Sequence, residues 1–184
     1  PLAEVGRRAS GLPRGAWGMT LAHIGLGVFV MGAAFETAWK VEAAEVRPVG
    51  GVVALGDFRL TLQDVGPAPG PNYDAEHARI RVEGPGGRLA CLAEPERRTY
   101  DSGGQTTSEV AICAKGADDI YVVLGDRRVG PDETPQWLIR AYWNPWARFL
   151  FLGPILMALG GALSLSDRRL RFGVARRKVA AAPG

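Results

Sequence analysis

The stretch WGMTLAHIGLGVFVMGAAFETAW, residues 17–39, is the strongest indication of the fold. It is apolar over most of its length and begins and ends with tryptophan. Within it, residues 19–35 contain one ionisable side chain, His23. A second apolar block, Phe149–Leu165, contains none. Each block has about 17 residues, the short end of what crosses a hydrocarbon core about 30 Å thick. The two blocks predict two transmembrane helices, with a buried helix of a soluble protein as the alternative.

Charged residues are distributed unevenly along the chain, although the net charge is only +3. Residues 41–147 hold 11 Lys and Arg against 16 Asp and Glu, a net of −5. The N-terminal flank carries a net of +2, and the tail after Leu165 a net of +5. Basic flanks mark the cytoplasmic side of a membrane helix. We therefore expect both termini in the cytoplasm and the acidic middle on the opposite side, and we expect no nucleic-acid partner.

Tryptophans flank both apolar blocks: Trp17 and Trp39 around the first, Trp143 and Trp146 before the second. Such positions suit the headgroup region of a bilayer. The predicted organisation is a cytoplasmic basic flank (1–16), a transmembrane helix (17–39), a periplasmic β domain (40–145), a second transmembrane helix (146–166) and a cytoplasmic basic tail (167–184). The first residue, Pro1, is not an initiator methionine, so a portion of a longer protein is expected.

The middle of the chain contains short alternating or apolar runs separated by Gly, Pro, Asn and Asp, which is typical of a β-sandwich or barrel. Phe58, Leu60 and Leu62 alternate with polar residues, as a half-buried strand requires. The Gly56–Asp57 dipeptide predicts a hairpin turn. Residues 66–72 and the polar stretch 101–108 are expected to be loops. The predicted strands are 41–47, 52–55, 58–65, 78–83, 88–93, 110–114, 120–124 and 137–142.

Two cysteines, Cys91 and Cys113, fall in predicted strands of the translocated domain. An oxidising compartment permits a disulfide. Two buried free thiols in neighbouring strands are an equal alternative, because sequence does not give the Cα separation. Their spacing matches neither a metal site nor a C-x-x-C redox motif.

His23 carries the functional hypothesis, because an ionisable side chain inside a membrane helix normally faces a protein interior, a cavity or a ligand. Small residues surround it and allow close approach of another helix or of a flat ligand. Gly27, one turn away on nearly the same face, leaves space beside the imidazole. A neutral imidazole is a common axial ligand of haem iron. A histidine hydrogen-bonded to a neighbouring helix is the alternative. The small residues are Gly18, Ala22, Gly25, Gly27 and Gly32.

Residues 17–27, WGMTLAHIGLG, resemble the penultimate helix of the CcmF family, the large membrane subunits of the bacterial cytochrome c haem lyase, to which NrfE proteins are related. In that family the histidine of this helix is one of two transmembrane axial ligands of a b-type haem, and His23 matches it. The resemblance implies that the second ligand lies in an upstream part. The cysteine pair is not part of the family pattern, and His77 matches none of the family's functional histidines, which indicates a surface or strand-end residue. Further matching segments are 46–48, 70–73, 94–100, 107–112, 119–125, 137–145, 157–161 and 167–169.

The resemblance also implies the activity and the partners. The lyase joins the vinyl groups of haem to the thiols of a C-x-x-C-H motif in apocytochrome c, in the periplasm at the bacterial inner membrane. The b-type haem passes electrons, from quinol, to the incoming haem. Implied partners are the missing N-terminal part, other lyase subunits, a haem chaperone and apocytochrome c. No catalytic residue is expected in this chain, which alone is not expected to be active.

Two other classes of function compete with the haem-binding interpretation. A membrane-anchored β domain acting as a binding or scaffold module explains the topology but not His23. A transporter subunit would need more polar residues inside the membrane than these two helices contain. Neither a Ser/His/Asp set nor a phosphate-binding loop is evident.

Overall fold

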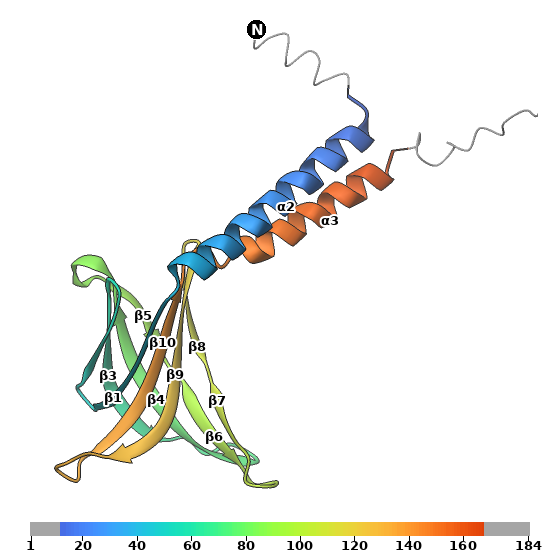
Figure 1. Cartoon of the computed structure of the whole chain (residues 1–184). Coiled ribbons are helices and arrows are strands. Elements are labelled where there is room, and N and C mark those ends of the chain that lie inside the picture. Colours follow the sequence, from blue (N-terminus) through green and yellow to red (C-terminus); the bar gives the residue numbers. More distant parts are fainter. Residues whose placement is uncertain (1–11, 168–184) are drawn as a thin grey trace, which may run out of the picture. The chain divides into compact units, whose positions relative to one another are not determined.

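The computed structural model describes residues 12–167, which divide into two compact units (Figure 1). The helical unit comprises residues 12–31 and 149–167, and the β unit comprises Gly32–Arg148. Helix α2, Arg14–Trp39, belongs to both units, because its last residues join the β unit.

The helical unit is an antiparallel pair, in which α2 lies beside α3, Phe149–Leu165 (Figure 1). Helix α3 coincides with the second predicted apolar block. Among the described residues, α2 is the one helix long and apolar enough to cross a membrane, and α3, with 17 residues, is shorter. Both predicted helices are therefore present, and their crossing of a membrane stays a prediction.

The β unit is a sandwich of two antiparallel sheets. The four-stranded sheet has the order β1-β10-β9-β8, and the six-stranded sheet has the order β2-β3-β4-β6-β7 with β5 also paired to β4. The strands are β1 Val41–Pro48, β2 Val52–Leu55, β3 Phe58–Pro67, β4 Tyr73–Glu83, β5 Leu89–Ala93, β6 Glu96–Tyr100, β7 Thr106–Glu109, β8 Ala111–Lys115, β9 Asp118–Val129 and β10 Pro135–Asn144.

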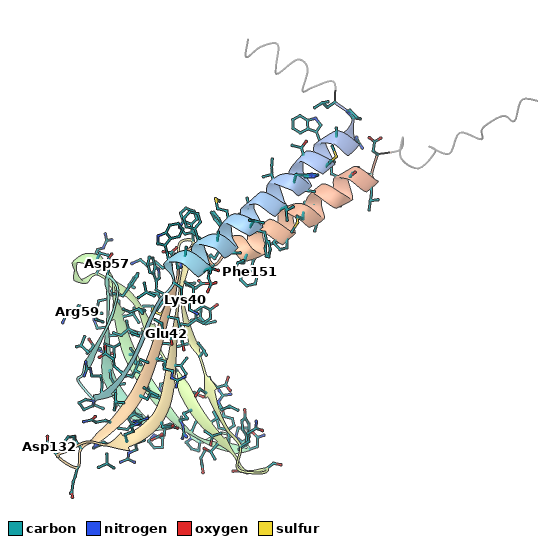
Figure 2. All side chains as sticks on the ribbon, in the orientation of Figure 1. Lys40, Glu42, Asp57, Arg59, Asp132 and Phe151 are labelled. Carbon is teal, nitrogen blue, oxygen red and sulfur yellow. A yellow bond between two sulfur atoms is a disulfide. The ribbon has the colours of Figure 1, made fainter. Side chains whose placement is uncertain are left out.

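Alternation along the strands forms the core between the sheets. Phe58, Leu60 and Leu62 are buried and Arg59 is exposed, which confirms the period-2 prediction for β3. The labelled charged side chains of the β unit, such as Arg59 and Asp132, point away from the sandwich (Figure 2). Large side chains from both sheets are fully buried: Val53, Leu55, Leu60, Leu62, Ile80, Val82, Ile120, Val122, Leu124 and Ile139.

A disulfide and a tight turn each connect two strands of the β unit. Cys91 of β5 and Cys113 of β8 form a disulfide with a Cα–Cα separation of 6.1 Å, so the bond joins one sheet to the other. The structure thereby decides between the disulfide and the two free thiols. The predicted Gly56–Asp57 hairpin connects β2 to β3, with Gly56 at φ +57°, a conformation that favours glycine.

Several local predictions were wrong. Strands β6 and β7 were not predicted, and β7 occupies part of the stretch 101–108 that was expected to be a loop. Strand β3 extends through Gly66 and Pro67, which were assigned to the loop 66–72. His77 lies inside β4, opposite Gly66 and Glu96, so it is not at a strand end, and its side chain is partly exposed. Trp143, the residue before the last of β10, packs against the sandwich core, 6.1 Å from Phe58 between ring centroids.

Candidate functional site

His23 lies in the second turn of the apolar block of α2, with its side chain exposed in the described structure. Its Nδ1 is 2.7 Å from the Met19 carbonyl oxygen, one turn earlier in the same helix. A carbonyl oxygen can only accept, so Nδ1 carries the proton and donates it. In the neutral ring the lone pair then lies on Nε2, which has no hydrogen-bond partner among the residues that the structure describes. The expected alternative, a bond to a neighbouring helix, is not found among them.

A shallow hollow of about 520 Å³ lies at His23 and is lined by Met19, Thr20, His23 and Ile24. The Thr20 hydroxyl donates to the Ala16 carbonyl oxygen at 3.0 Å, so the hydroxyl is engaged within its own helix. Four residues of a single helix form one wall of a site and leave the rest open. A ligand bound here therefore needs further contacts from outside the described residues.

Helix α3 packs against the side of α2 away from His23. A Cβ added at Gly25 would lie 2.7 Å from the Gly153 carbonyl oxygen, and one added at Gly160 would lie 2.5 Å from the Ala22 amide nitrogen. Real Cβ atoms do not approach backbone so closely, and glycine at these positions allows the two helix backbones to meet. At about 100° per residue, Gly25 projects about 160° from His23.

Gly27 is the exception among these small residues. A Cβ at this position would meet nothing within 4 Å, so no described residue requires glycine here. Glycine inside a helix costs about 1 kcal/mol relative to alanine. The predicted small-residue environment of His23 is thus divided: Gly18, Ala22 and Gly25 serve the contact with α3, and Gly27 lies on the histidine side.

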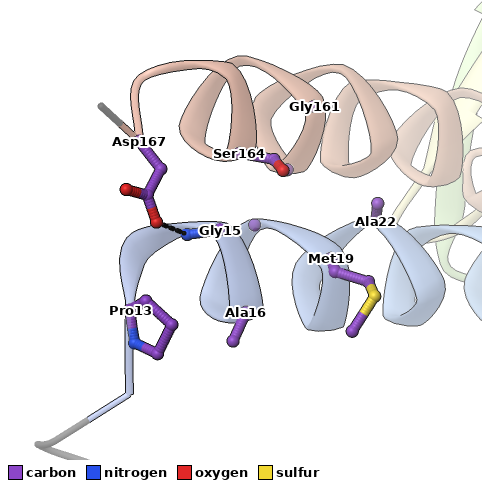
Figure 3. Close-up of a pocket in the computed structure, with 10 residues that line it drawn as sticks. Pro13, Gly15, Ala16, Met19, Ala22, Gly161, Ser164 and Asp167 are labelled. Carbon is purple, nitrogen blue, oxygen red and sulfur yellow. Dashed lines mark hydrogen bonds between the residues drawn. The ribbon is translucent and has the colours of Figure 1, made fainter. Parts of the chain in front are cut away.

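A second hollow, of about 590 Å³, lies at the end of the helix pair between α2 and α3 (Figure 3). Its walls are mostly glycine and alanine, with Met19 and Ser164 beside them. The Asp167 carboxylate at its edge is buried and accepts a hydrogen bond from the Gly15 amide at 2.9 Å (Figure 3). This carboxylate caps the N-terminus of α2 from the end of α3, where the helix dipole favours negative charge.

Replacing Asp167 with alanine is expected to destabilise the helix pair by about 1 kcal/mol, because the Gly15 amide loses its acceptor and the helix dipole loses its counter-charge. Thermal unfolding of the protein in detergent measures the effect. Ser166→Ala is the matched control, since the Ser166 hydroxyl bonds only the Leu163 carbonyl oxygen within α3 among the described residues. Equal midpoints for the two variants would contradict the capping role of Asp167.

The polar groups of the β unit form no catalytic arrangement within the described residues. No group of three or more His, Cys, Asp or Glu side chains is positioned to hold a metal ion in residues 12–167. His77 lies 3.9 Å from the Glu94 carboxylate, at ion-pair distance. Arg98 donates a hydrogen bond to the Glu96 carboxylate, which raises the pKa of Arg98, and its guanidinium also lies 4.6 Å from the Tyr73 ring centroid. These contacts join β4 to β6 and to Glu94 just before β6, and among the described residues His23 is the candidate ligand of a cofactor.

Known proteins resemble this chain in sequence and in fold. The family model "CcmF C-terminal beta-sandwich" matches residues 38–145. The cytochrome c-type biogenesis protein CycK of Bradyrhizobium diazoefficiens is 38% identical over 173 residues, which cover 94% of this chain and 26% of that protein. CcmF of Escherichia coli is 35% identical over 164 residues, covering 89% and 25%. The solved structure of cytochrome c haem lyase CcmF has a TM-score of 0.63 at 16% identity, covering 82% of this chain and 24% of that one, and so supports the fold alone. The chain spans about a quarter of the length of these relatives.

Proposed function

The chain belongs to the CcmF family of cytochrome c-type biogenesis proteins, and we propose that it is the C-terminal part of a haem lyase membrane subunit that binds b-type haem through His23. The observation that carries this proposal is the state of the imidazole. Its Nδ1 is held by the Met19 carbonyl oxygen, which leaves Nε2 available as a ligand, and the residue lines an open hollow. A hydrogen bond from the ring nitrogen that does not bind the metal fixes the tautomer and orientation of a metal-binding histidine.

The residues present fit one axial side of a haem. His23 supplies a nitrogen ligand, and Gly27 leaves the neighbouring turn uncovered. When bound, the haem supplies one-electron chemistry, with a potential that its axial ligands help to set. His23 acts as an orienting and redox-tuning ligand and not as an acid, base or nucleophile. A second ligand would come from the upstream part of the protein.

We place the chain in the bacterial inner membrane, with residues 17–39 and 146–166 as two membrane spans. Residues 1–16 and 167–184 lie in the cytoplasm, and residues 40–145 in the periplasm. The apolar surface of α2 supports this placement, since Ile24, Leu26 and Val30 are about half exposed. The exposed Trp39 and Trp146, both beside Phe35, suit a headgroup region. The disulfide suits an oxidising compartment.

In this function the chain acts with other proteins to reduce haem and attach it to apocytochrome c. Its partners are the upstream part of the same protein, other lyase subunits, a haem chaperone and apocytochrome c, with quinol as the electron source. The names of the relatives support a role in cytochrome c biogenesis. His23 is the one haem ligand proposed in this chain, and we expect activity only in the assembled protein.

The reduced-minus-oxidised absorption spectrum of the protein, purified in detergent together with its upstream part, tests the proposal. We expect the bands of a low-spin b-type haem at close to one haem per protein. A protein that accumulates in the membrane without these bands would contradict haem binding. The chain would then be a membrane-anchored β domain that serves as a scaffold without a cofactor.

A further inference from the structure

Gly27 has no explanation in the packing of the described chain. Gly18 and Gly25 face α3 and would clash with its backbone if they carried a Cβ. Gly27 projects about 160° from Gly25 at about 100° per residue, and a Cβ there would meet nothing within 4 Å. Its backbone is helical, so no left-handed conformation requires glycine either. Nothing in the described residues therefore requires glycine at position 27, and this face of α2 is open to a ligand or a helix from outside them.

The position of Gly27 relative to His23 leaves a space open beside the imidazole. The two residues are four apart and lie on nearly the same face of α2. Side chains in a helix lean toward the N-terminus and cover the preceding turn. The imidazole accordingly leans toward Met19, and a side chain at position 27 would cover the turn of His23. Without that side chain, the C-terminal flank of the imidazole stays uncovered.

We propose that Gly27 is a positioning residue that lets a planar macrocycle, coordinated through His23 Nε2, lie directly against the backbone of α2. This inference rests on the proposed haem function and extends it to a second residue. A ring coordinated at Nε2 spreads sideways over the residues beside the imidazole, and a bulky side chain at position 27 would tilt or exclude it. Helix α3 takes no part in the site, because it occupies the opposite face.

The test compares substitutions at helical glycines in the protein produced with its upstream part. Gly27→Leu is expected to lower haem per protein about tenfold or more, the range seen when the surroundings of a metal ligand are altered. Gly27→Ala is expected to retain part of the haem with a shifted reduction potential. Gly161→Leu is the matched control, because Gly161 in α3 also has nothing within 4 Å of an added Cβ. It is expected to keep the haem and its potential.

The outcomes separate this inference from the proposed function. If His23→Ala loses the haem and both Gly27 variants keep it with an unchanged potential, the role of Gly27 is wrong and haem ligation by His23 stands. If His23→Ala keeps the haem, the proposed function fails, and the inference fails with it. If Gly27→Leu accumulates to a lower level than the haem-free His23→Ala protein, Gly27 seats a helix of the upstream part, which overturns the inference.

Discussion

Replacing His23 with alanine is expected to remove the b-type haem from the assembled protein, with a loss of at least about tenfold in haem content. The iron would lose one axial nitrogen, and its low-spin bands would disappear with it. The fold should survive, since the His23 side chain is exposed, packs on no part of α3 and bonds only its own helix among the described residues. The measurement is the reduced-minus-oxidised spectrum at equal protein concentration.

Two further variants make this result specific to ligation. His77→Ala removes the other histidine of the chain, which lies in β4 near Glu94, and should leave the spectrum unchanged. His23→Gly opens a cavity where the ring was, and added imidazole should restore part of the low-spin bands. Unchanged bands in His23→Ala would mean that this histidine is not a ligand, and the scaffold interpretation of the β domain would replace the haem lyase one.

The strands of the core could be predicted because burial alternates along them. In the first half of β3, Phe58, Leu60 and Leu62 are apolar and buried and alternate with polar residues, so the pattern can be read from the sequence. Strands β6 and β7 could not be predicted in this way. Their sequences, ERRTY and TTSE, contain no fully buried residue, and they are stabilised by backbone pairing and by ion pairs such as Arg98 with Glu96 and Glu109. Without a buried face, a strand shows no hydrophobic period.

At the candidate site, too, the sequence predicts some features and not others. His23 could be identified because an ionisable residue inside an apolar block is rare. The face of α2 that meets α3 could not be identified from the sequence, because small residues occur on both sides of the helix. Gly25 and Gly27 are only two positions apart and serve opposite faces, which became evident only from the backbone of α3. Likewise, the pairing of Cys91 with Cys113 depends on two strands from different sheets that sequence does not place side by side.

Replacing both Cys91 and Cys113 with alanine is expected to destabilise the β unit by about 3 kcal/mol, or about 10 °C in its unfolding midpoint. The disulfide closes a loop between residues 22 apart in sequence and joins the two sheets at β5 and β8. Its loss enlarges the freedom of the unfolded chain, and alanine at the buried position 113 also leaves less apolar contact in the core. The change is measured by thermal unfolding of the full chain, with the circular dichroism signal of the β strands as the readout.

Reductant separates the covalent contribution from the packing contribution. Unmodified protein treated with reductant keeps both sulfur atoms in place, so its midpoint should fall most of the way to that of the double variant. The double variant itself should not respond to reductant. If the unfolding midpoint of the unmodified protein does not change after complete reduction, the disulfide contributes nothing to stability. Because the two sheets also share the buried side chains of β2, β3, β9 and β10, we expect the reduced protein to remain folded at 25 °C, with the disulfide adding to a core that is already complete.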